Sequence, residues 1–172
     1  MEFFANELYH IFNRGNNKQK IFFSSDNYIY FLKKVEAHIY PCCSILAYCL
    51  MPNHFHFLVH SDKRTTATKL IGGKERNILS EGIRNTLSSY TQAINKQNTS
   101  TGSLFQQNTK ARPMVKGGKN YDLICLHYIH QNPVRAKLVT KMEDWPYSSF
   151  SDYCGLRTGT LATGYWVLNC SI

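Results

Sequence analysis

Residues 44–60 constrain the fold more than any other part of the chain. Residues 44–50 form an apolar run that is typical of a buried strand, and Pro52-Asn53 provides a tight turn after it. The following residues alternate in polarity, so an extended strand has one histidine face and one apolar face. These faces carry His54, His56 and His60 on one side and Phe55, Phe57 and Val59 on the other. We therefore expect a β-hairpin whose second strand is anchored through its apolar face.

The histidine face has two interpretations. His54 and His56 are two residues apart, so their imidazoles point to the same side of a strand and can bind one cation. An isolated His-x-His pair is also common on a half-exposed strand that faces water. The rest of the chain decides between a metal site and a solvated face.

The remaining elements can be placed from periodicity and breakers. Residues 8–14 alternate like a strand, and Pro41 ends a helix that starts after Ser24. In order, we expect a strand at 8–14, a helix at 24–40, the hairpin, a helix at 76–96, a short strand pair at 104–106 and 111–115, and a helix at 121–131 before Pro133. This order predicts an α+β fold of the ferredoxin-like sandwich kind, with an antiparallel sheet and helices on one face. Residues 1–154 are expected to form one domain, and we assign no role to the tail at 155–172.

The charge of the chain favours a polyanionic partner. Twenty Lys and Arg residues against eleven Asp and Glu residues give a net charge of +9, which favours nucleic acid. No apolar run reaches the twenty or so residues that a spanning helix needs, so we expect a cytoplasmic protein with no membrane partner. The candidate phosphate-binding residues fall in two basic stretches and are Arg14, Lys18, Lys20, Lys110, Arg112, Lys116 and Lys119.

The last predicted helix supplies a candidate nucleophile. Helical spacing places Tyr128 away from the apolar stripe, so its phenolate is available to attack a phosphorus atom polarised by a metal on the histidine pair. Asn132 lies one turn later, about 6 Å away, and its amide oxygen is a candidate third ligand. Gln131 or His130 are alternatives, because the residue before Pro133 is biased away from helical angles. A plain packing role for Tyr128 is the competing interpretation, since the chain has eleven tyrosines.

Three motifs in the chain match a known family. Residues 9–17 (Tyr-His-Ile-Phe-Asn-Arg-Gly-Asn-Asn), 51–56 (Met-Pro-Asn-His-Phe-His) and 128–136 (Tyr-Ile-His-Gln-Asn-Pro-Val-Arg-Ala) occur in the family's order. The chain thus resembles the single-tyrosine HUH transposases, and most closely their REP-associated branch, from about residue 8 to about residue 153. A chance His-x-His pair would not bring the second motif with it.

The resemblance implies a fold, a cofactor and a reaction. It implies a ferredoxin-like HUH endonuclease fold, a Mg²⁺ or Mn²⁺ ion, and cleavage of single-stranded DNA near hairpins, in which the tyrosine keeps the 5′ phosphate and releases a 3′ hydroxyl. Carried over to this chain, His54 and His56 match the metal pair and Tyr128 the nucleophile. Asn132 matches the third-ligand position, which is glutamine in related insertion-sequence transposases.

These observations favour a metal-dependent transposase that cleaves and rejoins single-stranded DNA through a covalent 5′-phosphotyrosine. The alternative is a non-catalytic module that binds a DNA hairpin through its basic stretches. A hydrolase of small phosphorylated substrates is disfavoured, because the chain lacks the usual carboxylate cluster. Relatives act either as monomers or as homodimers that share their active sites, and the sequence leaves both states open.

Overall fold

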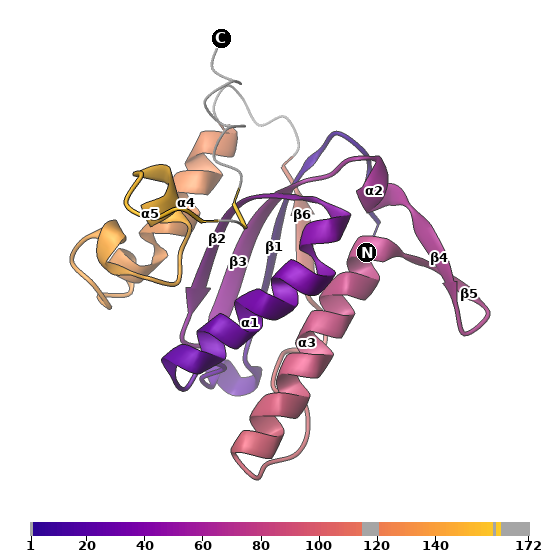
Figure 1. Cartoon of the computed structure of the whole chain (residues 1–172), viewed down its shortest axis with the longest axis horizontal. Coiled ribbons are helices and arrows are strands. Elements are labelled where there is room, and N and C mark those ends of the chain that lie inside the picture. The colour runs from indigo at the N-terminus through magenta and orange to yellow at the C-terminus, as the bar shows by residue number, and fades with distance from the viewer. Residues whose placement is uncertain (1, 115–120, 160, 163–172) are drawn as a thin grey trace.

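The computed structural model describes residues 2–114, 121–159 and 161–162, and it contains one four-stranded antiparallel sheet (Figure 1). The strands are β1 (Leu8–Arg14), β2 (Ser44–Met51), β3 (His54–His60) and β6 (Lys110–Pro113), in the order β2-β3-β1-β6. The principal helices are α1 (Ser25–His38), α3 (Ile78–Gln97) and α4 (Tyr121–Arg135). This strand order, with β1 and β3 at the centre, confirms the predicted ferredoxin-like architecture.

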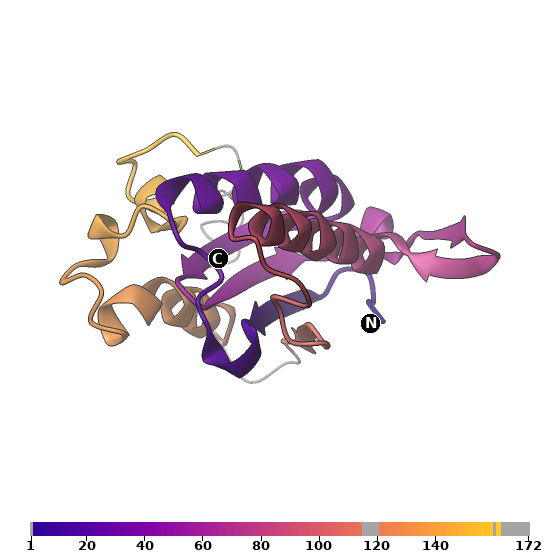
Figure 2. The same ribbon diagram turned by 90° about the horizontal axis from the view of Figure 1, so that it is seen from below.

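Shorter elements connect the principal ones. These are the 3-10 helices η1 (Asn16–Lys18), η2 (Tyr40–Cys42) and η3 (Met142–Asp144), the helices α2 (Lys63–Thr66) and α5 (Phe150–Tyr153), and the two-stranded hairpin of β4 (Thr68–Ile71) and β5 (Lys74–Asn77). The hairpin was not expected from the sequence, which shows only a polar, basic stretch there. It projects from the body of the protein in both views (Figures 1 and 2).

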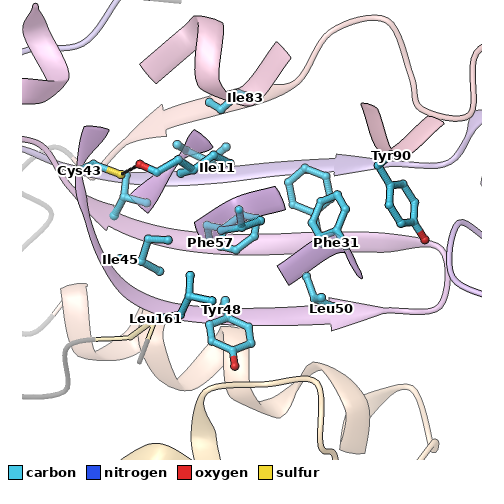
Figure 3. Close-up of a cluster of buried hydrophobic side chains, with 14 of the residues drawn as sticks. Ile11, Phe31, Cys43, Ile45, Tyr48, Leu50, Phe57, Ile83, Tyr90 and Leu161 are labelled. Atoms are coloured by element: carbon cyan, nitrogen blue, oxygen red, sulfur yellow. Dashed lines mark hydrogen bonds between the residues drawn. The ribbon is translucent and has the colours of Figure 1, made fainter. Parts of the chain in front are cut away.

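Helices α1 and α3 cover the apolar face of the sheet. Asn27 stabilises the start of α1, because its side-chain oxygen accepts a hydrogen bond from the backbone N–H of Ser24. The core between helices and sheet contains Phe31, Phe57 and Tyr90, each at most 1% exposed (Figure 3). The phenylalanine face of β3 is therefore the anchor that the alternation predicts.

Helix α4 lies on the opposite face, beneath the histidine side of the sheet (Figure 2). Cys125 and Ile129 of α4 pack in a second buried cluster with Leu46, Ala47, Cys49, Met51 and Leu58 of the sheet. The expectation of helices on one face thus describes α1 and α3, while α4 forms a third layer. Periodicity identifies the apolar stripe of a helix but does not say which face of a sheet it covers.

Helix α4 also extends to Arg135, two residues beyond Pro133, although the sequence predicted that the helix ends before this proline. Proline has no N–H to donate to the carbonyl of Ile129. The side-chain amide of Asn132 donates to that carbonyl at 3.2 Å and to the carbonyl of Tyr128 at 2.9 Å. Asn132 thereby replaces the missing backbone hydrogen bond and lets the helix pass through the proline.

The predicted strand pair of residues 104–106 and 111–115 is only partly correct. Within the described residues, Phe105 forms a single bridge with Gly15, whereas β6 pairs with β1. Strand β6 is an edge strand, as expected from Pro113. Val115 lies outside the described residues.

Part of the C-terminal segment packs on the same core. The guanidinium of Arg157 forms an ion pair with Asp152 at 2.7 Å and donates to the carbonyls of Pro146 and Ser148, both at 2.8 Å. Leu161 and Ala162 are buried in the main core. The boundary expected at residue 154 stays a prediction. No helix among the described residues has the length and apolar character needed to cross a membrane.

Candidate metal and nucleophile site

The register of β1 and β3 builds the site on the face covered by α4. His54 pairs with Arg14 and His56 pairs with Phe12, and His10 lies two pairs further along, opposite Leu58. Alternation then places His10 on the same face as the histidine pair. Three imidazoles are thus grouped on the two central strands.

Each histidine of the pair has its Nδ1 atom engaged. Nδ1 of His56 lies 2.8 Å from Nε2 of His10, and Nδ1 of His54 lies 2.6 Å from Oδ1 of Asn53. An asparagine oxygen only accepts, so His54 carries its proton on Nδ1. Neither Nε2 atom has a hydrogen-bond partner among the described residues. The two ring centroids are 5.0 Å apart with planes at 87°, and this arrangement leaves two Nε2 lone pairs for a cation.

The surroundings keep these imidazoles neutral. Burial is the main reason that the pKa of His56 is lowered to about 3, and the neighbouring His10 and His54 contribute to the same shift. Burial, together with Arg112, lowers the pKa of His10 to about 4. Burial, together with Arg14, lowers that of His54 to about 4. At neutral pH all three rings are in the uncharged form that a metal ligand requires.

Tyr128 lies against the histidines of its own chain. Its ring centroid is 5.9 Å from that of His56 and 6.2 Å from that of His10, both in edge-on geometry. The ring is 39% exposed. The guanidinium carbon of Arg135 lies 5.9 Å from the ring centroid. Tyr128 of α4 is therefore partly exposed to solvent and lies next to the imidazoles of β1 and β3.

A cavity of about 520 Å³ separates α4 from β1 and β6 at this point. Its lining includes His10 of β1, His56 of β3, Tyr128 of α4 and Arg112 of β6. The guanidinium carbon of Arg112 is 5.4 Å from the ring centroid of Phe12, which also lines the cavity. The cavity is thus lined by a candidate nucleophile, two imidazoles and a cationic group.

Asn132, the candidate third ligand, has its amide nitrogen committed to the backbone of α4. No hydrogen bond joins Asn132 to His54 or His56, and its Oδ1 is the atom that remains for a cation. The alternatives lie elsewhere. His130 is 2% exposed with Nε2 2.8 Å from Oγ of Ser149, and the side-chain nitrogen of Gln131 is 2.6 Å from Nε2 of His127.

The histidine pair is not part of a larger metal-binding cluster among the described residues. Within residues 2–114, 121–159 and 161–162, no group of three or more His, Cys, Asp or Glu side chains is placed to hold a metal ion. The two Nε2 atoms fit Mn²⁺ better than Mg²⁺, because imidazole suits manganese and magnesium prefers oxygen ligands. The remaining positions of such an ion are open to water, a phosphate oxygen or the Asn132 amide oxygen.

The structure separates the predicted basic residues into two groups. Arg14 lies at the end of β1 opposite His54, with Lys18 and Lys20 in the exposed segment that follows it. Lys110 and Arg112 lie on β6, opposite Phe12 and His10 of β1. Lys116 and Lys119 fall outside the described residues. The five described residues thus lie at and after the end of β1 and on its neighbour β6.

His10 is the site residue that the sequence did not single out. It belongs to the Tyr-His start of the first motif, and alternation along residues 8–14 places it on one face with Phe12 and Arg14. Its approach to His56 depends on the antiparallel pairing of β1 with β3. A sequence shows the alternation but not which strands are neighbours.

The fold and the site together define the class of protein: a ferredoxin-like domain with a histidine pair on a central strand and a helical tyrosine beside it. A solved structure described as a REP-associated tyrosine transposase bound to a REP hairpin is similar, with a TM-score of 0.64 and 16% identity over 96% of this chain and 88% of that chain. No curated protein sequence matches this one. The model of the IS200-like transposases matches residues 4–132, and the protein belongs to this transposase family.

Proposed function

We propose that the protein cleaves and rejoins single-stranded DNA next to a hairpin, with Tyr128 as the nucleophile. The observation that carries the proposal is the edge-on approach of the Tyr128 ring to His56 within one chain, in a cavity that Arg112 also lines. The solved relative with this fold was bound to a REP hairpin, which supports a hairpin substrate. Family membership supports the transposase role.

The reaction assigned to Tyr128 is a transesterification. Its oxygen attacks the scissile phosphorus and forms a P–O bond, while the bond to the 3′ oxygen breaks and that oxygen leaves with a proton as a 3′ hydroxyl. The 5′ phosphate stays on the tyrosine. Attack of another 3′ hydroxyl on the phosphotyrosine reverses these steps and joins strands. The energy of the phosphodiester is conserved, so no other co-reactant is needed.

His54 and His56 are the residues proposed to hold a Mn²⁺ or Mg²⁺ ion through their Nε2 atoms, with Oδ1 of Asn132 as a third ligand. When bound, such an ion withdraws electron density from the scissile phosphate and stabilises the charge of the transition state. Asn53 and His10 hold the Nδ1 sides of the two rings. These contacts fix the ring orientations before a cation arrives.

The basic residues at and after the end of β1 and on β6 are proposed to bind the DNA backbone. Arg112 stacks near Phe12 at the cavity and is suited to orient the phosphate that reacts. Arg14, Lys18, Lys20 and Lys110 provide further phosphate contacts, and Lys116 and Lys119 complete the proposed set. Replacing Arg112 with Ala is expected to slow adduct formation more than it weakens DNA binding.

The proximity of Tyr128 to His56 in one chain favours a monomer with a complete active site. A homodimer that exchanges α4 between subunits is the alternative arrangement. Mixing a Tyr128→Phe protein with a His56→Ala protein separates the two. Recovery of adduct formation in the mixture indicates shared sites, and its absence supports a site within one chain.

The test of the chemistry is a covalent protein–DNA adduct. We expect a labelled hairpin oligonucleotide with an unpaired flank to give a protein-linked band on a denaturing gel when Mn²⁺ or Mg²⁺ is present, and Tyr128→Phe to abolish it. Tyr40→Phe is the matched control, since Tyr40 is 37% exposed and lies in η2 on the other side of the sheet. An adduct in Tyr128→Phe would assign the nucleophile elsewhere.

The histidine pair needs its own test. His54→Ala and His56→Ala are expected to abolish the adduct while the protein still binds the oligonucleotide, and His60→Ala is the control on the same strand and face. If no oligonucleotide and no metal gives an adduct but hairpins bind in a salt-sensitive way, the non-catalytic binding module is the better description.

A further inference from the structure

The hairpin of β4 and β5 is the one strongly basic feature, among the described residues, to which the proposed function assigns no role. Its register pairs Lys69 with Arg76 and Ile71 with Lys74. Directly paired residues share a face, so one face of this ribbon carries three cationic side chains and no carboxylate of the ribbon. Its other face carries Leu70 opposite Glu75.

The charges on the basic face are only partly compensated. Arg76 pairs with Glu81 of α3 at 3.5 Å, whereas Lys69 and Lys74 form no ion pair with any described residue. Like charges directly opposite each other destabilise a strand pair, and Lys69 faces Arg76 in this register. An isolated two-stranded ribbon is itself only marginally stable in water. A polyanion lying against this face would relieve the repulsion.

The ribbon is held firmly at its base. The side-chain nitrogen of Asn77 donates to the carbonyl of Thr65 at 2.6 Å, and the hydroxyl of Thr65, which is fully buried, donates to the carbonyl of Cys42 at 2.8 Å. The N–H of Ile78 donates to the carbonyl of Ala67 at 3.0 Å. These contacts fix the direction in which the ribbon leaves the protein.

The tip of the ribbon is narrow. Gly72 and Gly73 have positive φ angles of 57° and 76°, as a two-residue hairpin turn requires, and a Cβ at either position would meet nothing within 4 Å. The tip is therefore free to enter a groove. The major groove of duplex DNA, about 12 Å wide, admits a two-stranded β-ribbon.

We propose that the β4–β5 ribbon is a second DNA contact, which lies along the duplex stem of the hairpin while the histidine face handles the unpaired strand. This inference rests on the proposed function for the hairpin substrate. Lysines that contact phosphates carry no base recognition, so the ribbon adds affinity and sets the position of the stem but does not read sequence.

The distance along the chain gives the stem length that the ribbon needs. Strand β3 ends at His60, four residues or roughly 13 Å past His56, and residues 61–67, including α2, connect it to the ribbon, whose own strands are roughly 13 Å long. Duplex DNA rises about 3.4 Å per base pair, so a stem of about four base pairs spans only the distance from His56 to the end of β3, and contact with the ribbon beyond it requires a longer stem. A stem shorter than about four base pairs does not reach it.

The test is the stem-length dependence of binding by the double variant Lys69→Gln/Lys74→Gln. Two hairpin oligonucleotides share one loop and one unpaired flank and have stems of about four and about twelve base pairs, chosen from the rise of the duplex. On the long stem we expect a loss of affinity on the order of tenfold and a salt dependence that is shallower by about 1.8 in slope, for two lost phosphate contacts. On the short stem we expect the double variant to bind with the same affinity and the same salt dependence as the wild type.

The matched control is Lys33→Gln/Lys96→Gln, which removes the same charge from exposed positions of α1 and α3. The proposal is overturned if both double variants lose the same DNA affinity. It is also overturned if Lys69→Gln/Lys74→Gln loses as much affinity on the short stem as on the long stem. The proposed chemistry is tested separately from the ribbon. It requires that the wild type and Lys69→Gln/Lys74→Gln both form the adduct on the short stem. Binding to the long stem decides the ribbon even if no adduct forms.

A second copy of the chain is the competing occupant of the ribbon, because no other described strand pairs with either ribbon edge and Leu70 is 69% exposed. Sedimentation of the wild type and of Leu70→Ser without DNA distinguishes this case. A fall in molecular mass in Leu70→Ser, together with unchanged DNA affinity in the lysine variant, assigns the ribbon to self-association and overturns the DNA proposal.

Discussion

Nε2 of His10 lies 2.8 Å from Nδ1 of His56, so the buried imidazole of β3 is held by a second imidazole from β1. A cation on Nε2 of His56 requires the proton on Nδ1, and His10 is then the acceptor of that proton. His10 contacts the proposed ligand but not the proposed cation, which makes it a positioning residue.

Replacing His10 is therefore expected to weaken metal binding. His10→Phe keeps a ring of similar size and removes the acceptor, so we expect the affinity for Mn²⁺ to fall by about 10- to 100-fold. His10→Gln retains an acceptor oxygen and is expected to recover part of the loss. Electron paramagnetic resonance of free Mn²⁺ measures the affinity, and His38→Phe on α1 is the control. Equal affinities in His10→Phe and the wild type would show that His10 only fills space.

The sequence predicted which faces carry the candidate site residues better than it predicted how those faces are packed. Alternation in residues 54–60 and helical spacing around Tyr128 identify the two faces that meet, because each pattern depends on neighbours in the chain. The contact of His10 with His56 and the position of α4 beneath the sheet depend on strand order, which local patterns do not contain. The β4–β5 ribbon escaped prediction because its alternating residues are nearly all polar.

Asn132 has two separable roles in the structure and in the proposed mechanism. Its amide nitrogen satisfies the carbonyl left open by Pro133, and its oxygen is the proposed third ligand. Asn132→Asp keeps an oxygen and loses the donor, so we expect about 1 kcal/mol lower stability with Mn²⁺ affinity retained. Asn132→Ala is expected to lower both the stability and the affinity for Mn²⁺. Urea denaturation and Mn²⁺ titration measure the two properties, and retained affinity in Asn132→Ala would exclude the amide oxygen as a ligand.

Gly82 permits the close packing of α3 against the end of α1. A Cβ at this position would overlap the backbone carbonyl oxygen of His38, and the neighbouring Sγ of Cys42 lies 3.6 Å from it. We expect Gly82→Ala to lower the free energy of unfolding by about 1–3 kcal/mol, because backbone atoms of α1 must move to make room. Thermal denaturation measures the loss, with Lys96→Ala on the exposed side of α3 as the control. A stability equal to that of the wild type would mean that the two helices separate at little cost.

Because His130 is buried, we expect the free energy of unfolding to fall in acid. Burial, together with the nearby His127, lowers the pKa of His130 from 6.5 to about 4 in the folded protein. Well above pH 6.5 the His130 ring is neutral in both the folded and the unfolded protein, so it does not change the free energy of unfolding. Between pH 6.5 and about 4 only the unfolded state binds the proton, so the free energy of unfolding falls as the pH falls, by up to about 3 kcal/mol from this group. His130→Gln has no such proton to bind, and we expect its stability to depend less on pH within this window when urea denaturation is repeated at each pH. An identical pH dependence in the variant and the wild type would show that His130 titrates normally in the folded state.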